Sequence, residues 1–471
     1  MPTFDWTRWS IAVADAALSS HASPAALEAR RHERLQRLVE AASGARWFAA
    51  RLGPRPAGGW RLQDLPTTRK STLMGRFDEW VTDPAVELHA LQAFMADPAR
   101  IGTLFLDRYA VWQSSGSSGE PGTFVTDGGA LAVYDALESC RRAALRPASR
   151  LLDPLMATER IAFVGAIDGH FASIAAFERL RRLNAWLEPR MAAFSLLQPV
   201  DALAAALEDF APTLLCTYPS CAAILAEQAA RTRLRLRLRE IWTGGEPLTP
   251  ALRGFLSSTF GCPVGNEYGA SEFLPLAMEC ARGRLHLNAD WAILESVDAQ
   301  GRPVHPGSRG ARCLLTNLAN HVQPIVRYEL GDRVAFRGDP CPCGSTLPVV
   351  DVLGRDDDLL HVGKGPQGVA LSPLALTTVL EEEAGLFDFQ LVQRAPDRLE
   401  LRMRASTRAQ ASRLQRGRDV LVDFLAKQGA THVTVDCRAA DPLRTGTSGK
   451  LKRVLMAAST RPPKARAGRG R

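Results

Sequence analysis

The spacing of apolar residues changes along the chain, and each spacing predicts a different element of secondary structure. Residues 24–50 have helical spacing, with four apolar side chains on one side: Leu27, Leu35, Leu38 and Val39. Between about residues 107 and 257, short apolar runs alternate with longer stretches of helical spacing. We expect strands at 109–112, 161–164 and 212–216, and helices at 203–210 and 222–231. This alternation predicts βαβ units, and therefore an α/β fold with a largely parallel sheet covered by helices.

The spacing changes again around an acidic run at residues 354–358. The stretch before it, residues 312–350, is strand-rich, whereas the stretch after it mixes helices expected at 373–383 and 409–428 with a strand at 433–435. We therefore predict a large N-terminal domain at residues 1–354, which includes a strand-rich subdomain, and a small mobile α+β domain at 355–460. Residues 461–471 are rich in arginine, proline and glycine and are expected to be a disordered basic tail.

The composition is that of a globular protein, with 46% hydrophobic and 23% charged residues. No apolar run reaches the roughly 18–20 residues of a membrane helix, and the N-terminal residues do not resemble a signal peptide, so we expect a cytoplasmic protein without a membrane partner. The tail supplies five basic residues and no acid to the net charge of +8, so nucleic acid is not an expected partner. Nine cysteines, an odd number, argue against a disulfide framework.

A run of serine and glycine follows the first expected strand: Ser114, Ser115, Gly116, Ser117, Ser118 and Gly119. Glycines allow the backbone to fold tightly around phosphates, and serine hydroxyls and main-chain N–H groups can donate hydrogen bonds to them. The run is not a Walker loop, because it lacks the Gly-Lys-Ser/Thr of that motif. Taken alone it predicts either a phosphate-binding loop or a plain flexible loop.

Further motifs follow in a fixed order: Gly244-Gly245-Glu246-Pro247, Glu267-Tyr268-Gly269-Ala270-Ser271-Glu272, Arg327-Tyr328-Glu329-Leu330-Gly331-Asp332, Gly354-Arg355-Asp356-Asp357 and Ser448-Gly449-Lys450. Each motif alone is weak evidence. In this order and at these distances, together with the serine–glycine run, they resemble the ATP-handling motifs of the adenylate-forming superfamily of acyl-CoA synthetases and related ligases.

The resemblance implies ATP and Mg²⁺ as cofactors. It assigns the triphosphate to residues 114–119 and the adenine side to residues 244–247. In the motif that runs from Glu267 through Gly269 to Glu272, the aromatic residue would stack on adenine, the hydroxyl would contact the α-phosphate, and the last carboxylate would bind Mg²⁺. Carried over, these residues are Tyr268, Ser271 and Glu272. A single carboxylate together with phosphate oxygens suits Mg²⁺.

The same resemblance assigns the ribose hydroxyls to Asp332. Arg355 would contact ribose or phosphate, and Asp357 would be the hinge about which the small domain rotates between two half-reactions. Lys450 would enter the site during adenylation, where a mobile cation fits the charge that builds on the α-phosphate and the carboxylate. Lys452 takes that role if the register differs.

Three N-terminal stretches resemble the phenylacetate–CoA ligase branch more specifically: Arg31-His32-Glu33-Arg34-Leu35, Leu65-Pro66-Thr67-Thr68-Arg69-Lys70 and Gly169-His170-Phe171-Ala172-Ser173. The resemblance covers about residues 25–457. It implies an aryl or arylalkanoic acid as substrate and CoA as acceptor. His170, Phe171 and Tyr218 are candidate neighbours of the acid, although each could equally belong to the core.

Some members of that branch carry a structural zinc, and four residues here would supply a Cys₃His set: Cys280, His286, Cys341 and Cys343. Thiolate and imidazole ligands suit tetrahedral zinc. The spacing Cys341-x-Cys343 is tighter than the usual Cys-x₂-Cys. The alternative is a proline-stiffened Cys-Pro-Cys-Gly turn beside a surface histidine.

Two departures from the family pattern leave the acceptor open. Glu120 stands where the phosphate loop commonly has lysine, and residues 363–368 lack the usual pattern of the small domain. The acceptor could therefore be an amine, an alcohol or a carrier-protein thiol instead of CoA, and the enzyme could be a homodimer. Two other classes stay open as hypotheses: a degenerate ligase that binds nucleotide without turnover, and a non-catalytic zinc-knuckle protein that contacts nucleic acid.

Overall fold

The chain divides into two compact units, which are described separately. The first comprises residues 1–248, 256–353 and 447–449, and the second comprises residues 249–255, 354–446 and 450–471. The computed structural model describes residues 5–114, 122–142, 145–153, 156–183, 185–232, 234–308, 310–355, 360–363, 369–371, 373–405, 407–439 and 453–456.

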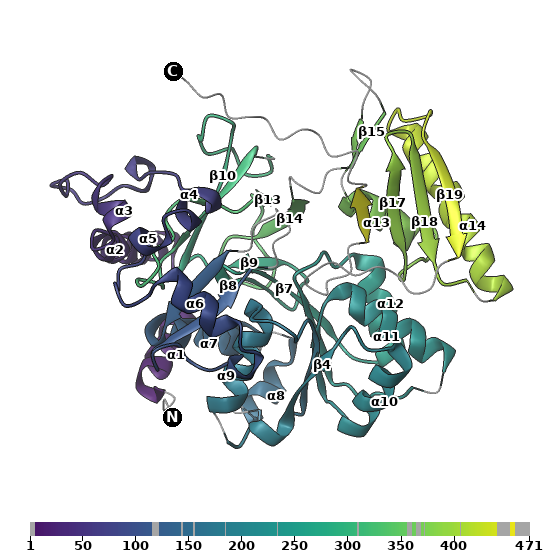
Figure 1. Ribbon diagram of the computed structural model, residues 1–471, viewed down its shortest axis with the longest axis horizontal. Helices are drawn as coiled ribbons and strands as arrows, with labels where there is room; N and C mark the ends of the chain where they lie inside the picture. The colour runs from purple at the N-terminus through teal and green to yellow at the C-terminus, as the bar shows by residue number, and fades with distance from the viewer. Residues whose placement is uncertain are drawn as a thin grey trace. The chain divides into compact units, whose positions relative to one another are not determined.

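A seven-stranded sheet organises the first unit (Figure 1). Its strand order is β4-β3-β5-β6-β7-β8-β9, with bounds Met191–Ser195, Ile161–Gly165, Leu214–Thr217, Glu240–Gly244, Val264–Ala270, Phe273–Glu279 and Leu285–Leu287. The first five strands in this order are parallel, and the last two continue antiparallel. The predicted α/β class with a largely parallel sheet is confirmed.

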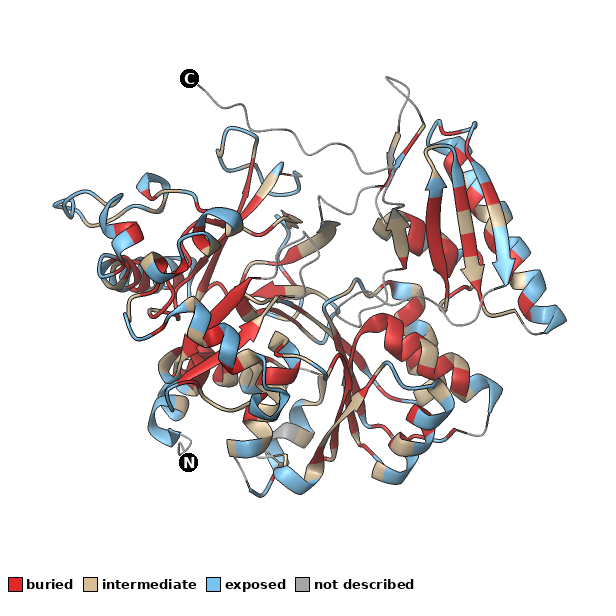
Figure 2. Ribbon diagram, viewed as in Figure 1, coloured by how far each residue is buried: buried red, intermediate tan, exposed pale blue. Residues whose placement is uncertain are grey.

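The central parallel strands are largely buried because helices cover both faces of such a sheet. All five residues of β3 are buried, and most residues of β5 and β6 are buried as well (Figure 2). Helices α10 (Val200–Phe210) and α11 (Pro219–Arg231) lie on one side of the sheet, and α8 (Pro147–Leu152) and α9 (Ala172–Leu183) lie on the other. Helix α12 (Pro250–Phe260) connects β6 to β7.

The N-terminal residues of this unit form helices, of which α1 packs along α7 (Gly128–Arg142). These helices are α1 (Trp6–Ser19), α2 (Pro24–Ala42), α3 (Arg46–Ala49), α4 (Lys70–Met74), α5 (Phe77–Trp80) and α6 (Leu88–Met95). Helix α2 begins at a proline, and the side chain of Ser23 caps it by accepting a hydrogen bond from the backbone N–H of Ala26. The predicted apolar side of this helix is confirmed, because its four leucine and valine side chains are buried.

Two antiparallel elements complete the unit. Strands β10 (Ala292–Val297), β11 (Arg312–Asn317) and β12 (Tyr328–Glu329) form one sheet, and β13 (Asp332–Phe336) pairs with β14 (Val350–Arg355). Strand β1 (Tyr109–Gln113), expected among the parallel strands, instead forms a separate antiparallel hairpin with β2 (Thr123–Asp127). The connection between them is too short for the crossover that a parallel pair requires.

The second unit has its own core. A four-stranded sheet has the order β19-β18-β17-β20, with bounds Thr434–Ala439, Arg398–Met403, Gln390–Ala395 and Val454–Met456. Helices α13 (Pro373–Glu382) and α14 (Arg408–Lys427) supply its apolar cover, and β15 (Leu360–Val362) pairs with β16 (Val369–Leu371). Helix α14 begins with a capping box between Thr407 and Gln410.

Candidate active site

A contact between distant segments brings the N-terminal region to the ends of the sheet strands. Thr68 donates its backbone N–H to the carbonyl of Arg327 at 3.1 Å, and its own carbonyl accepts from Glu329 N at 3.0 Å. Its hydroxyl donates to the carbonyl of Val326 at 2.9 Å. This pairing fixes the start of α4, two residues further on, beside the motif that ends at Asp332.

Arg327 anchors the same contact from the other side. Its backbone has a positive φ of 43°, which is unusual for a residue with a side chain. Its guanidinium is buried and pairs with both carboxylate oxygens of Glu295, at 3.0 and 3.1 Å. A bidentate, buried pair of this kind has defined geometry. Arg327 therefore holds the backbone of the motif that ends at Asp332.

Lys70 lies at the base of the serine–glycine loop. Its Nζ donates to Ser114 Oγ at 3.1 Å, and Ser114 Oγ also accepts from Gly122 N at 2.8 Å. Ser114 N in turn donates to the carbonyl of Gly122 at 2.8 Å. Ser114 and Gly122 therefore form a hydrogen-bonded pair at the two ends of the serine–glycine segment, and the ammonium group of Lys70 lies beside this pair.

Tyr268 and Asp332 come together although 64 positions separate them. The phenolic oxygen of Tyr268 donates to Asp332 Oδ2 at 2.7 Å. Tyr268 stands near the end of β7, and Asp332 is the first residue of β13. A glycine is required at position 269, because a Cβ there would lie 2.3 Å from the carbonyl oxygen of Leu274.

Glu272 is half-buried near these groups. Burial raises the pKa of Glu272 above its usual value, while a hydrogen bond from Tyr328 and the charge of Lys70 oppose that shift. The carbonyl of the neighbouring Ser271 accepts from Trp112 Nε1 at 2.8 Å, which fixes the turn that carries both residues. A single carboxylate can share Mg²⁺ with phosphate oxygens.

The expected adenine-side loop lies at the end of β6. Gly245 has a φ of +74°, which favours glycine. Glu246 points away from the loop: its Oε2 accepts from Ser220 N at 2.9 Å, in the first turn of α11. The carboxylate at this position therefore supports the start of a helix, and Gly244, Gly245 and Pro247 present the loop surface.

The three candidate neighbours of the acid differ in exposure. His170 and Tyr218 are 1% and 6% exposed, whereas Phe171 is half-buried. His170 packs on Phe94, with ring centroids 5.8 Å apart, and burial lowers the pKa of its imidazole. Tyr218 is hydrogen-bonded to Ser173 and to the backbone of Ala166, and burial raises its pKa. The burial of His170 and Tyr218 favours a role in shaping the core over direct contact.

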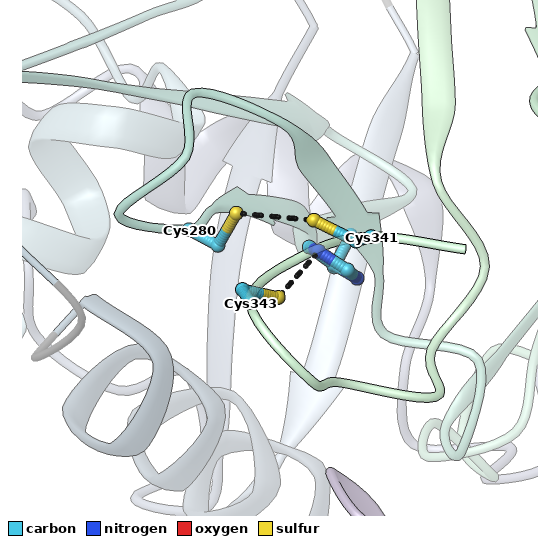
Figure 3. A group of neighbouring side chains, drawn as sticks. Cys280, Cys341 and Cys343 are labelled. Carbon is cyan, nitrogen blue, oxygen red and sulfur yellow. Dashed lines mark hydrogen bonds between the residues drawn. The ribbon is translucent and has the colours of Figure 1, made fainter. Parts of the chain in front are cut away.

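The four candidate zinc ligands converge. The donor atoms of Cys280, His286, Cys341 and Cys343 all lie within 4.8 Å of one another. Figure 3 shows the three thiols facing the imidazole, with Cys280 Sγ 3.8 Å from Cys341 Sγ and Cys343 Sγ 3.3 Å from His286 Nε2. The residues that the sequence analysis placed in one set therefore form one cluster.

The surroundings of this cluster fit a tetrahedral metal. His286 Nδ1 lies 2.9 Å from the carbonyl of Leu347, and burial lowers the pKa of the ring. A neutral ring that donates from Nδ1 presents the Nε2 lone pair to the thiols. Backbone N–H groups of Arg282 and Ser345 point at Cys280 Sγ and Cys343 Sγ, at 3.4 and 3.5 Å. Such donors stabilise thiolates.

Several predicted residues lie outside the described residues: Ser115, Gly116, Ser117, Ser118, Gly119, Asp357 and Lys450, together with Glu120 and Lys452. Strand β14 ends at the backbone of Arg355. The described part of the site therefore comprises Ser114, the 244–247 loop, the turn from Glu267 to Glu272, and Asp332.

Lys70 is the residue that the sequence analysis missed as a candidate site residue. Its distance from Ser114 depends on the pairing of Thr68 with residues more than 250 positions away. A signal was present, because Glu120 occupies the position where lysine is common, and triphosphate requires a cation from some other segment.

Comparisons with known proteins give one family match and several structures of similar fold. Residues 191–315 match the AMP-binding enzyme family. The fold is similar to that of 2-hydroxyisobutyryl-CoA ligase in the postadenylation state with 2-HIB-AMP, with a TM-score of 0.71 and 20% identity over 94% of this chain and 92% of that one. Anthranilate CoA ligase with anthranoyl-AMP gives a TM-score of 0.50 and 16% identity, over 73% of this chain and 64% of that one.

A curated relative, protein CapK from Staphylococcus aureus, is 23% identical over 198 residues. The match spans 41% of this chain and 42% of the relative. The chain thus has the fold of adenylate-forming ligases. Among the described residues, no helix is both long and apolar enough to cross a membrane.

Proposed function

We propose that this chain activates a carboxylic acid with ATP, forming an acyl-adenylate and releasing pyrophosphate, and then transfers the acyl group to a thiol. The observation that carries the proposal is that Lys70 contacts Ser114 and Tyr268 contacts Asp332, while the charges of Lys70 and Asp332 both act on Glu272. These residues supply, in one place, a cation, a hydroxyl, an aromatic ring and two carboxylates. A nucleoside triphosphate needs this combination.

In the first half-reaction, a carboxylate oxygen of the acid attacks the α-phosphorus and pyrophosphate leaves. Asp332 accepts hydrogen bonds from the ribose hydroxyls, and Tyr268, held by Asp332, packs on the base. Glu272 would hold Mg²⁺ together with phosphate oxygens, and the ion would neutralise charge on the triphosphate. Lys70 lies beside the phosphate loop. Its positive charge would offset the negative charge of the triphosphate, which the carboxylate of Glu120 cannot do.

Lys450 and the hinge belong to the same proposal. Lys450 stabilises the charge that develops between the carboxylate and the α-phosphate. Rotation of the smaller domain about Asp357, with Arg355 at the ribose or phosphate, then admits the second nucleophile. CoA is the proposed nucleophile: its thiol attacks the acyl carbon of the adenylate, the acyl–phosphate bond breaks, and acyl-CoA and AMP are released. An amine, an alcohol or a carrier-protein thiol is the second candidate, because Glu120 and residues 363–368 depart from the pattern of the acid–CoA ligases.

The proposed substrate is an aryl or arylalkanoic acid, following the resemblance to phenylacetate–CoA ligases. Structural neighbours hold both 2-HIB-AMP and anthranoyl-AMP, so the proposal of an aromatic acid rests on the sequence resemblance. We also propose that Cys280, His286, Cys341 and Cys343 bind a structural zinc. The four protein ligands would close its coordination sphere, so this zinc takes no part in the chemistry.

Pyrophosphate release tests the proposal directly. Wild type and Lys450→Ala are incubated with Mg-ATP and a panel of aryl, arylalkanoic and aliphatic acids. At least one acid should give release that falls by orders of magnitude in the variant. CoA, amines and alcohols are then added to identify the acceptor. ATP binding without release for any acid would favour a degenerate ligase, and absence of ATP binding would overturn the proposal.

A further inference from the structure

The two-residue turn between β7 and β8 carries Glu272, the proposed metal ligand. Ala270 pairs with Phe273 across this hairpin, so Ser271 and Glu272 are the two turn residues. The two-residue turns that hairpins favour require a positive φ at one or both of these positions. Neither Ser271 nor Glu272 has a positive φ. The turn therefore departs from the types that match the twist of the strands, and we expect contacts from other elements to hold it.

Two buried side chains donate hydrogen bonds to the backbone of this turn. Trp112 Nε1 donates to the carbonyl of Ser271 at 2.8 Å, and Asn317 Nδ2 donates to the carbonyl of Glu272 at 2.8 Å. The two donor residues are 1% and 0% exposed. Trp112 belongs to β1, two residues before Ser114, and Asn317 is the last residue of β11. Two strands outside the seven-stranded sheet thus fix successive carbonyls of one turn.

Asn317 is committed to this contact, because every hydrogen-bonding group of its side chain is used. Oδ1 accepts from the backbone N–H groups of Ala319 and Asn320, at 3.0 and 3.3 Å. Since an N–H group can only donate, this pairing identifies Oδ1 and leaves Nδ2 to face the turn. Nδ2 donates to the Glu272 carbonyl and to Tyr134 Oη, the latter at 2.7 Å. A buried amide that makes all four bonds holds its partners rigidly.

Two tyrosines support the same turn. The buried ring of Tyr134, whose hydroxyl accepts from Asn317, packs on the buried ring of Phe273 with centroids 4.9 Å apart. Tyr328 is hydrogen-bonded to the carboxylate of Glu272. The carbonyl and the carboxylate of Glu272 therefore have different partners, and the partner of the carbonyl is the one that faces away from the proposed metal.

We propose that Asn317 and Trp112 are positioning residues, which fix the turn so that the Glu272 carboxylate is preset to bind Mg²⁺ together with the triphosphate. This inference rests on the proposed function and names residues that act through its metal ligand. Mg²⁺ demands near-ideal octahedral geometry, so a carboxylate on a loosely held turn binds it less well. Partners that orient a metal ligand typically contribute about tenfold or more to metal affinity.

The chain offers a matched control for each donor. Asn320 is 2% exposed, its Oδ1 accepts from two backbone N–H groups, and its Nδ2 donates to the carbonyl of Val125 at 2.8 Å. Trp80 is 0% exposed, and its Nε1 donates to the carbonyl of Pro324 at 2.6 Å. Both controls make the same kind of buried bond as the donors to the turn, but to carbonyls elsewhere in the unit.

The test measures how much Mg²⁺ strengthens the binding of α,β-methylene-ATP, an analogue that cannot release pyrophosphate. Titration calorimetry with and without Mg²⁺ gives two dissociation constants, and their ratio is the readout. Asn317→Asp keeps Oδ1 and the size of the side chain but removes the donor, and Trp112→Phe removes Nε1. The ratio should fall about tenfold in Asn317→Asp and severalfold in Trp112→Phe, and Glu272→Gln should lower it at least as far.

Asn320→Asp and Trp80→Phe should keep the wild-type ratio, although each should lower the melting temperature about as much as its counterpart at the turn. A purely structural role would weaken binding of the analogue equally with and without Mg²⁺, and the ratio would not move. If Asn317→Asp does not fold, Trp112→Phe carries the same test, because it keeps an aromatic ring in the same place.

An unchanged ratio in Asn317→Asp, Trp112→Phe or Glu272→Gln overturns the inference, and so does an equal fall in a variant and its control. Pyrophosphate release by wild type separates this failure from failure of the proposed function. Release with at least one acid, without the expected change in ratio, would leave the proposed function intact. Absence of release with any acid contradicts the proposed function itself.

Discussion

Tyr268 donates its phenolic hydrogen to Asp332 across 2.7 Å, which joins the residue proposed to pack on adenine to the residue proposed to hold ribose. Replacing Asp332 with alanine removes the acceptor for the Tyr268 hydroxyl and the proposed acceptor for the ribose hydroxyls. A hydrogen bond to a charged group contributes about 1.5–3 kcal/mol, so we expect KM for ATP to rise at least about tenfold. Tyr268→Phe keeps the ring and loses one bond, so KM should rise only a few-fold. The two KM values are measured by pyrophosphate release.

The double variant of this pair tests whether the two residues act together. If Tyr268 matters through Asp332, its substitution should add little in the Asp332→Ala background, because coupled residues are not additive. Fully additive effects on KM would show that the two residues bind ATP independently.

Lys70 should matter for the triphosphate although it lies outside the serine–glycine loop. We expect Lys70→Ala to lower kcat/KM for ATP by about tenfold or more, because a preorganised cation beside phosphate is lost. Lys70→Arg should recover part of the loss. Arg69→Ala is the matched control, since Arg69 is 65% exposed and pairs with Glu329. An equal loss in both variants would point to a disturbed α4 helix instead.

The cysteine cluster should bind about one zinc ion per chain, measured by elemental analysis of the purified protein. Cys343→Ser should abolish most of the bound zinc and lower the melting temperature by several degrees, because metal binding stabilises the folded state. Cys437→Ser, an exposed cysteine on β19, should change neither quantity. Zinc content that survives in Cys343→Ser would exclude the cluster as the binding site.

Gly269→Ala should inactivate or unfold the protein. The added methyl group would lie 2.3 Å from the backbone carbonyl oxygen of Leu274, and the backbone of the β7–β8 hairpin would have to move. Gly58→Ala, where nothing lies within 4 Å of the added carbon, is the control and should melt like wild type. Thermal unfolding and pyrophosphate release distinguish loss of fold from loss of function.

The sequence predicted the elements whose signal is local. The all-apolar run of β3 and the leucines on one side of α2 follow directly from spacing, and both predictions hold. The cysteines at 280, 341 and 343 could be grouped because the resemblance supplied the set. The pairing of β1 with β2 was missed, since an apolar run of this length does not reveal its partner.

The site residues that the sequence did not predict are placed by contacts between segments far apart in the chain. Nothing local marks Lys70, whose position depends on the backbone of Arg327. His170 and Tyr218 carry functional groups that are common in binding sites, yet packing has buried both. Side-chain chemistry alone therefore gives the type of site, whereas tertiary contacts decide which residues reach it.

The pairing of Thr68 with the backbone of Arg327 and Glu329 has a consequence for synthesis on the ribosome. The parallel strands β3 to β6 are complete once residue 244 has been made. Lys70 cannot be fixed beside Ser114 until β12 has also emerged, because its position depends on that strand. During translation the pairing of Thr68 must therefore wait for a partner more than 250 residues later. Until that partner is made, the start of α4 is not held beside Ser114, so this contact forms late in the folding of the chain.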